Sequence, residues 1–245
     1  MPLNFANFSP QDQGLSQALT QFLQQQILFG HLVPGELLPS QRHLSAALQI
    51  SRASVREALQ QLEQQGVITT RPGGRSQVNN LLSQSWQLGR SGMGSSAQST
   101  LQMLEVRAFL EGESAYYAAL RATPEERQAL ALEYEAMRER SQGQSTLAKA
   151  KADLRFHLMI ANASHHLLII SFSQLFYEQF FSLIHATLSI TLKRYGRYPD
   201  GIAAQHEKIH RAIQQGEAQI AREVAREHIL YTRGLIEAAL KAGPQ

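Results

Sequence analysis

The chain of 245 residues contains no cysteine. This absence excludes disulfide bonds, thiolate metal sites and a cysteine nucleophile, so His, Asp and Glu are the strong metal ligands that remain. No apolar run reaches the roughly 18 residues that cross a bilayer, and the first residues lack a basic region followed by an apolar one. We therefore expect a cytoplasmic protein with no membrane partner, in which any metal ion is held by nitrogen and oxygen.

Lysine is absent from residues 1–80, and the arginines of this stretch all lie between Arg42 and Arg75. The formal net charge of the whole chain is only +3, so the total says little about partners. Basic side chains gathered in one short stretch can form a positive patch. The distribution of charge is therefore more informative than its sum.

The chain is long enough for two domains. Residues 83–100 are rich in Ser, Gly and Gln and carry almost no apolar periodicity, which is typical of a connector. We predict one domain over 1–80, a linker over 81–100 and a second domain over 101–245. Beyond the linker, apolar residues recur at three- and four-residue spacing, which predicts six helices. Their expected bounds are 101–121, 124–141, 145–163, 166–194, 199–215 and 217–241.

The first 80 residues predict three helices and a small hairpin. A helix over about residues 12–30 is followed by two short helices, and Ser51 caps the second of them. Gly66 ends that helix, and residues 67–79 then predict two β-strands around a Pro-Gly-Gly turn. The predicted fold class is mainly α with a small β-wing. It consists of an N-terminal winged helix-turn-helix and a C-terminal all-α helical bundle.

Arginines occupy the positions from which such a domain contacts DNA. Arg52 and Arg56 lie one turn apart at the start of the second short helix, the end that enters a major groove. Arginine grips guanine edges and phosphates with two donors at once. Arg42 flanks this helix, and Arg71 and Arg75 lie on either side of the wing tip. Each alone is equally well explained as a solvated surface charge, but five together in this frame favour operator DNA as a partner.

Three short motifs stand out in this segment: LPSQR at residues 38–42, SRASVREAL at residues 51–59 and GVI at residues 66–68. Together they resemble the signature of the GntR family of bacterial regulators. The resemblance implies a DNA-binding transcription regulator in which the positions of Arg42, Arg52, Arg56 and the wing glycine contact operator DNA. The expected DNA-binding residues are therefore Arg42, Ser51, Arg52, Arg56, Arg71, Gly73 and Arg75.

Four side chains of the second domain form a candidate metal site. Asp153 and His157 lie four residues apart, so on a helix they project from one face as a chelating pair. His206 and His228 lie on two further predicted helices, and three helices of one bundle can direct all four side chains to a common interior point. This donor set suits zinc, and also nickel, manganese or iron. A lone histidine is more often an ordinary core or surface residue, so the hypothesis depends on the combination.

The stretch from Leu104 to Ala242 is similar to the ligand-binding domain of the FadR-type branch of the same family, especially the sensors of lactate, glycolate and pyruvate. The resemblance is carried by the Asp-x3-His pair and the two later histidines. It implies that these four residues bind a divalent metal ion. His210, one turn beyond His206, could compete as a ligand, and His206 is preferred because the family motif places the ligand there.

Arg107 is the expected effector contact, since the resemblance also places an effector-binding residue at this position. A guanidinium beside a metal ion with open positions selects a carboxylate, such as a 2-hydroxy or 2-keto acid that chelates the ion. The alternative is a helix-surface arginine that pairs with Glu111 at i+4.

The favoured hypothesis is a homodimeric repressor, not an enzyme, whose affinity for operator DNA changes when a small carboxylate occupies the metal site. Such a ligand acts only if it binds the DNA-competent and DNA-incompetent forms unequally. One alternative is a metal-dependent hydrolase in which the Asp and three His activate a water, but this hypothesis gives the wing arginines no role. Another is that the metal ion is purely structural.

Overall fold

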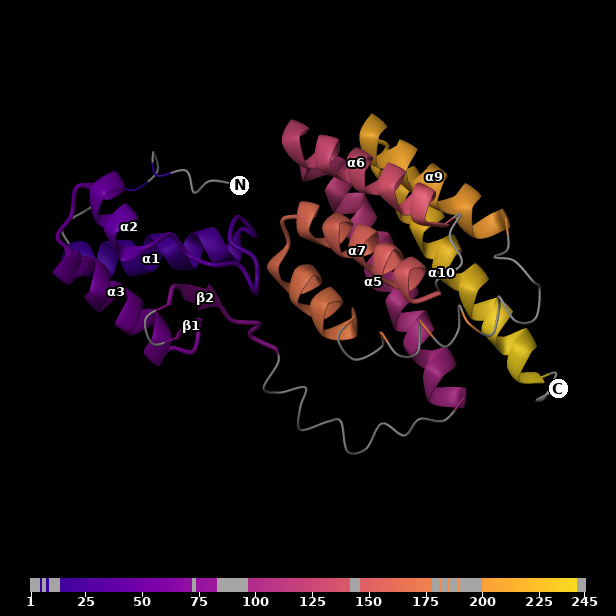
Figure 1. Ribbon diagram of the computed structural model, residues 1–245, viewed down its shortest axis with the longest axis horizontal. Coiled ribbons are helices and arrows are strands. Elements are labelled where there is room, and N and C mark those ends of the chain that lie inside the picture. Colours follow the sequence, from indigo (N-terminus) through magenta and orange to yellow (C-terminus); the bar gives the residue numbers. More distant parts are fainter. Residues whose placement is uncertain are drawn as a thin grey trace. The chain divides into compact units, whose positions relative to one another are not determined.

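The computed structural model describes residues 5, 8, 14–71, 74–82, 97–141, 146–177, 181, 185, 189 and 200–241. The chain divides into two compact units, Met1–Gln84 and Ser85–Gln245 (Figure 1). Helices dominate the described parts of both units, and the described strands lie in the first. The predicted fold class, mainly α with a small β-wing, is confirmed. None of the described helices is both long and apolar enough to cross a membrane.

Serine caps define the helix-turn-helix of the N-terminal unit. Ser40 Oγ accepts a hydrogen bond from the His43 amide at 3.2 Å, and Ser51 Oγ accepts one from the Ser54 amide at 3.0 Å. These bonds satisfy amides that have no partner within the helix and fix where each helix begins. Gln49 has a φ of 56°, and this left-handed residue turns the chain between the two helices. The helices of the unit are α1 Leu15–Leu28, α2 Gln41–Leu48 and α3 Arg52–Gln64.

Apolar residues at helical spacing bury the inner faces of these three helices. Leu19 and Leu23 of α1, Leu44 of α2, and Val55 and Leu62 of α3 have no exposed surface. Burial of a side chain of this size stabilises a fold by about 2 kcal/mol. The same periodicity leaves the outer face of α3 polar and directed to solvent.

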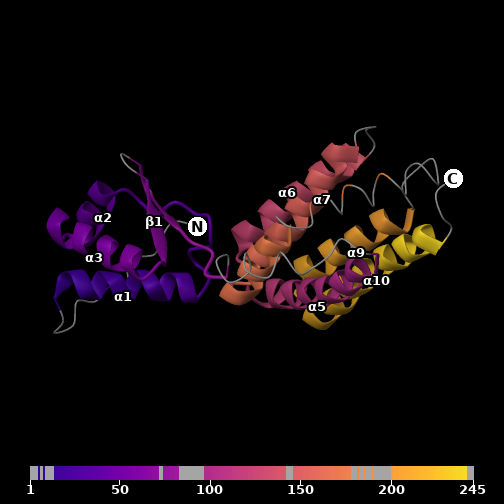
Figure 2. The ribbon, with the colours of Figure 1, turned by 90° about the horizontal axis from the view of Figure 1, so that it is seen from below.

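The wing is a two-stranded antiparallel sheet of β1 Ile68–Thr70 and β2 Ser76–Val78. The chain before α2 joins the free edge of β2, because Leu38 donates to the Ser76 carbonyl at 2.8 Å and Val78 donates to the Glu36 carbonyl at 2.9 Å. The wing is therefore attached to the start of the helix-turn-helix, and Figure 2 shows it beside the three helices. Gly73, an expected DNA contact, lies outside the described residues.

The C-terminal unit is helical throughout its described residues. A further helical segment covers residues 167–177, and most of the predicted continuation to 194 lies outside the described residues. The first helix begins at Ala97, inside the stretch that we expected to be a linker, and residues 83–96 of that stretch are also outside the described residues. The named helices are α5 Ala97–Arg121, α6 Pro124–Ser141, α7 Thr146–Ala163, α9 Asp200–Gln215 and α10 Ala218–Lys241.

The junctions between these helices have local causes. Thr123 Oγ1 accepts from the Glu126 amide at 3.2 Å, and Glu126 Oε2 accepts from the Thr123 amide at 2.9 Å, so the two residues form a capping box before α6. Gly216 has a φ of 72° between α9 and α10, a conformation that glycine adopts without strain. The helix ends predicted at both positions are confirmed.

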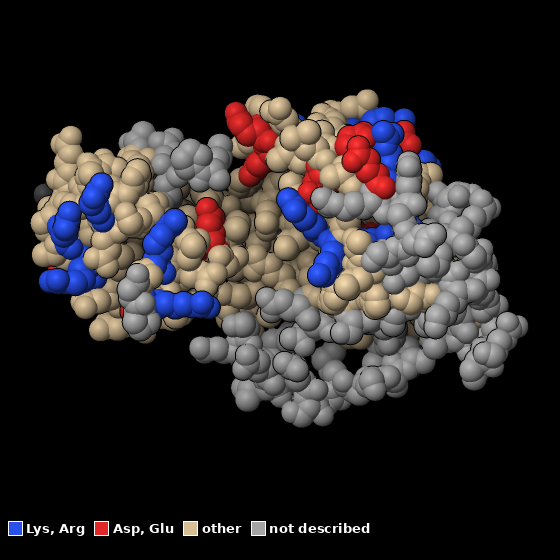
Figure 3. Space-filling model, viewed as in Figure 1, with Lys and Arg blue, Asp and Glu red and all other residues tan. Residues whose placement is uncertain are grey.

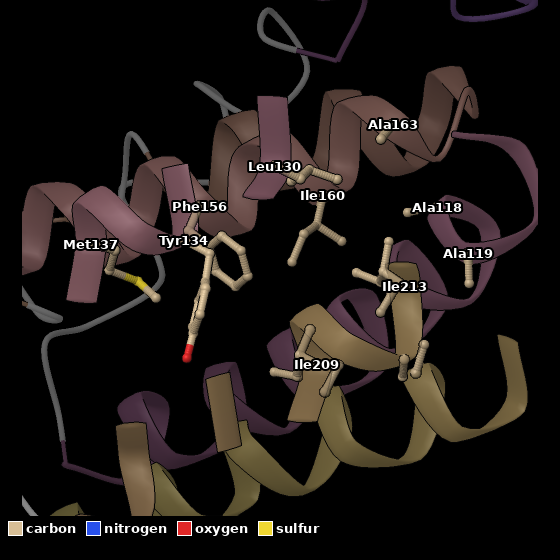
Figure 4. Close-up of a cluster of buried hydrophobic side chains, with 14 of the residues drawn as sticks. Ala118, Ala119, Leu130, Tyr134, Met137, Phe156, Ile160, Ala163, Ile209 and Ile213 are labelled. Atoms are coloured by element: carbon tan, nitrogen blue, oxygen red, sulfur yellow. The ribbon is translucent and has the colours of Figure 1, made fainter. Parts of the chain in front are cut away.

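The core of the C-terminal unit lies between α5, α6, α7, α9 and α10 (Figure 4). Phe156 and Ile160 of α7 lie across from Ile209 and Ile213 of α9, and all four are almost completely buried. α10 packs along α5 and against α9, and it adds Ala221 and Ala225 to the same core. The core matters for function because the candidate metal ligands lie on the same helices.

Candidate functional site

Three arginines project from the helix-turn-helix into solvent. Arg42 lies in the first turn of α2, and Arg52 and Arg56 lie in the first two turns of α3. All three are exposed, and none makes an ion pair or side-chain hydrogen bond with another described residue. A guanidinium without a protein partner is free to bind a polyanion, and the start of α3 is the part that enters a major groove in this fold.

The two wing arginines differ from each other. Arg71 is exposed and has no side-chain partner among the described residues. Arg75 donates from Nε to the Leu38 carbonyl at 2.8 Å and from Nη2 to the Leu37 carbonyl at 3.0 Å. These bonds hold the wing against the segment before α2 and leave fewer donors for DNA. The sequence pattern did not reveal this structural role of Arg75.

Basic side chains are well represented on the face of the N-terminal unit that Figure 3 shows, in blue. They are arginines, since this unit contains no lysine. The C-terminal unit presents both blue and red side chains in the same view. A surface with little acidic charge among its arginines attracts the phosphate backbone of DNA.

The structure brings the four predicted metal ligands together. Asp153 and His157 come from α7, His206 from α9 and His228 from α10, and one ligand atom of each lies within 4.8 Å of the others. His206 Nε2 lies 3.1 Å from Asp153 Oδ1 and 3.3 Å from His157 Nε2. An ion with bonds of about 2 Å keeps its ligands about 3 to 4 Å apart, so small side-chain movements would complete a coordination sphere. The geometry fits a metal ion, and its binding stays a prediction.

Each histidine of the cluster lies on the buried face of its own helix. On α9, His206 continues the stripe of Ile209 and Ile213, and on α10, His228 continues the stripe of Ala225. The three imidazoles of the cluster are at most 5% exposed. The packing that buries the apolar residues therefore also places the imidazoles in the interior.

Burial and neighbouring charges set the protonation states of the cluster. Burial alone would raise the pKa of Asp153, but the hydrogen bond with His206, the nearby imidazoles and the Arg107 guanidinium hold this pKa well below its ordinary value. Burial lowers the pKa of His206, and Asp153 opposes this only in part. Burial and the neighbouring imidazoles hold the pKa of His228 well below its ordinary value. At neutral pH the carboxyl group is therefore ionised and these two imidazoles are neutral, which are the forms that bind a metal ion.

Two polar side chains orient the imidazoles of His157 and His228 through contacts with their Nδ1 atoms. His157 Nδ1 lies 2.9 Å from Glu111 Oε2, and His228 Nδ1 lies 3.2 Å from Gln205 Oε1. An acceptor at Nδ1 leaves the lone pair of Nε2 free for a ligand bond. Burial alone would raise the pKa of Glu111, but its bonds with His157, Arg107 and Tyr177 hold this pKa at about 2. Glu111 is therefore a carboxylate at neutral pH.

Arg107 lies beside this cluster and is only 4% exposed. Its Nε lies 3.1 Å from Glu111 Oε1, and its Nη2 lies 3.8 Å from Asp153 Oδ2. Nη2 is buried and has no hydrogen-bond partner among the described residues. The i+4 pair with Glu111 therefore exists, but it lies in the interior next to the candidate metal ligands rather than on the helix surface. A buried donor without a partner favours any ligand that accepts from it.

Two residues of the site were not predicted in these roles. Glu111 occupies a core position of α5, in the stripe of Leu104, Ala108 and Ala115, and a carboxylate among buried apolar positions is the signal that could have identified it. The Tyr177 hydroxyl donates to Glu111 Oε1. No sequence motif indicates this bond, because the two residues lie 66 positions apart in the chain.

His210, the competing candidate, lies outside the cluster. Its ring stacks on Tyr134, with ring centroids 4.5 Å apart and planes inclined by 6°. The structure therefore places His206, and not His210, with the other three candidate ligands.

A winged helix-turn-helix with free arginines, joined to a helical domain with a buried His and Asp cluster, defines the class of DNA-binding regulators that carry a sensor domain. Residues 15–78 match the family described as bacterial regulatory proteins, gntR family, and residues 102–231 match the FCD domain. The chain therefore belongs to the GntR family of transcriptional regulators, in its FadR-type branch.

The chain is similar over most of its length to known regulators of Escherichia coli (strain K12). It is 31% identical over 219 residues to the Glc operon transcriptional activator, which covers 88% of this chain and 86% of that protein. It is 29% identical over 210 residues to a protein provisionally named L-lactate dehydrogenase operon regulatory protein, with 82% and 78% covered. These relatives are regulators and not enzymes.

A solved structure of a GntR protein from Streptococcus agalactiae has the same fold. The TM-score is 0.53 at 22% sequence identity, and the match covers 89% of this chain and 99% of that chain. This comparison supports the architecture of a winged helix-turn-helix followed by a helical domain.

Proposed function

We propose that this regulator is a homodimeric repressor whose affinity for operator DNA is changed by a small carboxylate bound at a divalent metal ion in the C-terminal unit. Each protomer would contact one half of a palindromic operator, with α3 in the major groove and the wing on the backbone. Arg42, Arg52, Arg56 and Arg71 would supply donors to DNA, and Ser51 would position α3 by capping it. Gly73 and the remaining donors of Arg75 would contribute at the wing.

The metal ion would be held by Asp153, His157, His206 and His228. One carboxylate and three imidazoles suit zinc best, and nickel, manganese and iron are accommodated by the same donors. When bound, the ion supplies a positive charge with open coordination positions that attract an anion. The chain's own residues orient the metal ligands, exclude water from the site and leave the guanidinium of Arg107 as a cationic donor beside it.

One observation carries the carboxylate proposal: Arg107 Nη2 is buried beside the cluster with no hydrogen-bond partner among the described residues. A carboxylate oxygen would satisfy this donor while a neighbouring oxygen reaches the metal ion. A 2-hydroxy acid fits because its hydroxyl and carboxyl oxygens chelate one ion. The name of one relative refers to an L-lactate dehydrogenase operon, which supports this class of effector.

A thermal-shift screen tests the proposal directly. The purified protein is loaded with zinc, and its melting temperature is measured with a panel of small carboxylates that includes L-lactate, glycolate and pyruvate. A ligand that prefers the folded protein raises the melting temperature by mass action. The shift should disappear when EDTA is present and when the matched amide, lactamide, replaces lactate. A wild-type protein that contains no metal by elemental analysis would contradict the proposal.

Two measurements test the proposed homodimer and the proposed repression. Sedimentation of the protein alone tests the homodimer, and a reporter gene behind the operator tests repression, because one relative is named an activator. Binding of the active carboxylate should change the affinity for an operator fragment, since an effector acts only through unequal affinity for two forms.

No specific observation favours the hydrolase alternative. Glu111, the additional carboxylate that contacts the cluster within the described part of the chain, is held by Arg107, His157 and Tyr177. It is therefore not free to act as a general base toward a metal-bound water.

A further inference from the structure

The carboxylate of Glu111 joins two parts of the candidate site that come from different helices. Its Oε2 lies 2.9 Å from His157 Nδ1 on α7. Its Oε1 lies 3.1 Å from Arg107 Nε on α5 and also accepts from the hydroxyl of Tyr177 in the helical segment 167–177. Glu111 is 4% exposed, so water does not compete strongly for either oxygen.

The Oε2 contact determines which nitrogen of His157 is available. A carboxylate at Nδ1 can only accept, so Nδ1 carries the proton and Nε2 keeps its lone pair. Nε2 faces the candidate ligands, 3.3 Å from His206 Nε2. The opposite tautomer would remove the hydrogen bond from His157 to Glu111 Oε2 and place a hydrogen where the metal ion would bind.

The Oε1 contact determines where the guanidinium of Arg107 points. With Nε held by Glu111, the planar group turns Nη2 toward Asp153 Oδ2, at 3.8 Å. The Tyr177 hydroxyl on the same oxygen keeps the carboxylate from rotating away. Arg107 is therefore aimed at the candidate metal ligands by the same side chain that orients His157.

We propose that Glu111 is the positioning residue of this site: one buried carboxylate fixes the metal-binding tautomer of His157 with one oxygen and aims the anion-binding Arg107 with the other. This inference rests on the proposed function. It adds that metal affinity and the orientation of the anion-binding donor depend on one shared side chain. Glu111 itself contacts neither the metal ion nor the effector.

The first test needs no variant. Long-range proton–nitrogen correlation NMR of the metal-free wild-type protein reports which imidazole nitrogen of His157 is protonated. Nδ1–H with an unprotonated Nε2 is expected, and an Nε2–H tautomer would overturn the proposal. The Arg107 Nε–H should exchange slowly with solvent, and exchange as fast as that of the exposed Arg52 would equally overturn it.

The second test compares Glu111→Gln with Glu113→Gln. Both change one carboxylate of α5 into an amide, but Glu113 is partly exposed and pairs with Arg222 at 2.8 Å, away from the cluster. The amide in Glu111→Gln keeps one accepting oxygen, so it can serve either His157 or Arg107 but not both. Zinc affinity, measured by competition with a chromophoric chelator, should fall by about 10- to 100-fold in Glu111→Gln and stay within about twofold in Glu113→Gln.

The outcomes separate this inference from the proposed function. If the wild-type protein does not bind zinc, the proposed function fails first. If it binds zinc and Glu111→Gln binds zinc as tightly as Glu113→Gln, only the role of Glu111 fails. If Glu111→Gln does not fold, the NMR measurement on the wild-type protein still decides the matter.

Discussion

The two units of this regulator use arginine in opposite ways. Arg52 and Arg56 of the N-terminal unit are exposed and lack partners among the described residues, whereas Arg107 of the C-terminal unit is buried and bonded to Glu111. An exposed guanidinium remains hydrated until a polyanion arrives, so it adds little to folding stability. A buried one must be paired to be tolerated, and only the donor left unpaired is available to a small anion. In the proposed function, Arg52 and Arg56 thus serve DNA binding alone, whereas Arg107 serves both the folding of its unit and the binding of an anion.

Among the substitutions that test this difference between the units, Arg107→Met should have the largest effect on stability. The substitution keeps much of the side-chain volume but leaves the buried carboxylate of Glu111 without its cationic partner. We expect the free energy of unfolding of the C-terminal unit to fall by about 3 kcal/mol, measured by urea denaturation of the metal-free protein. Arg52→Met is the matched control and should change stability by less than about 0.5 kcal/mol. Equal effects of the two substitutions would break the comparison.

Arg52→Met should produce the reverse pattern in DNA binding. Loss of a bidentate contact costs about 1–3 kcal/mol, or roughly 5- to 150-fold in affinity. Fluorescence anisotropy with an operator fragment selected from random-sequence DNA, at fixed salt, measures the change. Arg138→Met, at an exposed arginine that pairs with Glu135 in the C-terminal unit, should leave operator affinity unchanged. An unaltered affinity of Arg52→Met would remove this residue from the DNA interface.

The two wing arginines sharpen the comparison within one unit. Arg75 holds two backbone carbonyls, so Arg75→Ala should lower the unfolding free energy of the N-terminal unit by about 1–2 kcal/mol. Arg71→Ala should leave stability unchanged and reduce the slope of log affinity against log salt by about one. Thermal unfolding and a salt titration of DNA binding distinguish the two roles. A stable Arg75→Ala variant would show that its backbone bonds contribute little.

The smallest effect is expected from a partly exposed charge of the C-terminal unit. Burial alone would raise the pKa of Glu126, but its bonds with His165 and the Thr123 amide lower it overall. A lowered pKa means that Glu126 stabilises the fold above its ordinary pKa and that this contribution disappears as pH falls through the lowered value. Glu126→Gln should therefore reduce the melting temperature at pH 7 more than at pH 3. Glu125→Gln, at the exposed neighbour, is the matched control for the loss of one acidic charge in the first turn of α6.

Much of the fold followed from local patterns. Periodicity predicted α6 at its observed ends and the other named helices of the C-terminal unit within a few residues, because helix boundaries are set by side-chain bonds a few residues apart. The start of α5 was less accurate, since Ala97 lies in a Ser- and Gln-rich stretch that carries no cap or apolar period. The contact between the wing and Leu38 could not be predicted, because backbone pairing between distant segments has no sequence period.

The candidate site divides in the same way. The sequence by itself determined which residues are available: arginines at the start of α3, and one Asp and three His at spacings that place them on helix faces. Only the tertiary structure decided that Arg75 is tied to the backbone, that His210 stacks on Tyr134 outside the cluster, and that Glu111 bonds His157, Arg107 and Tyr177. The physical reason is that helical periodicity fixes the direction of a side chain relative to its own helix, whereas the partner it meets depends on how separate helices pack against one another.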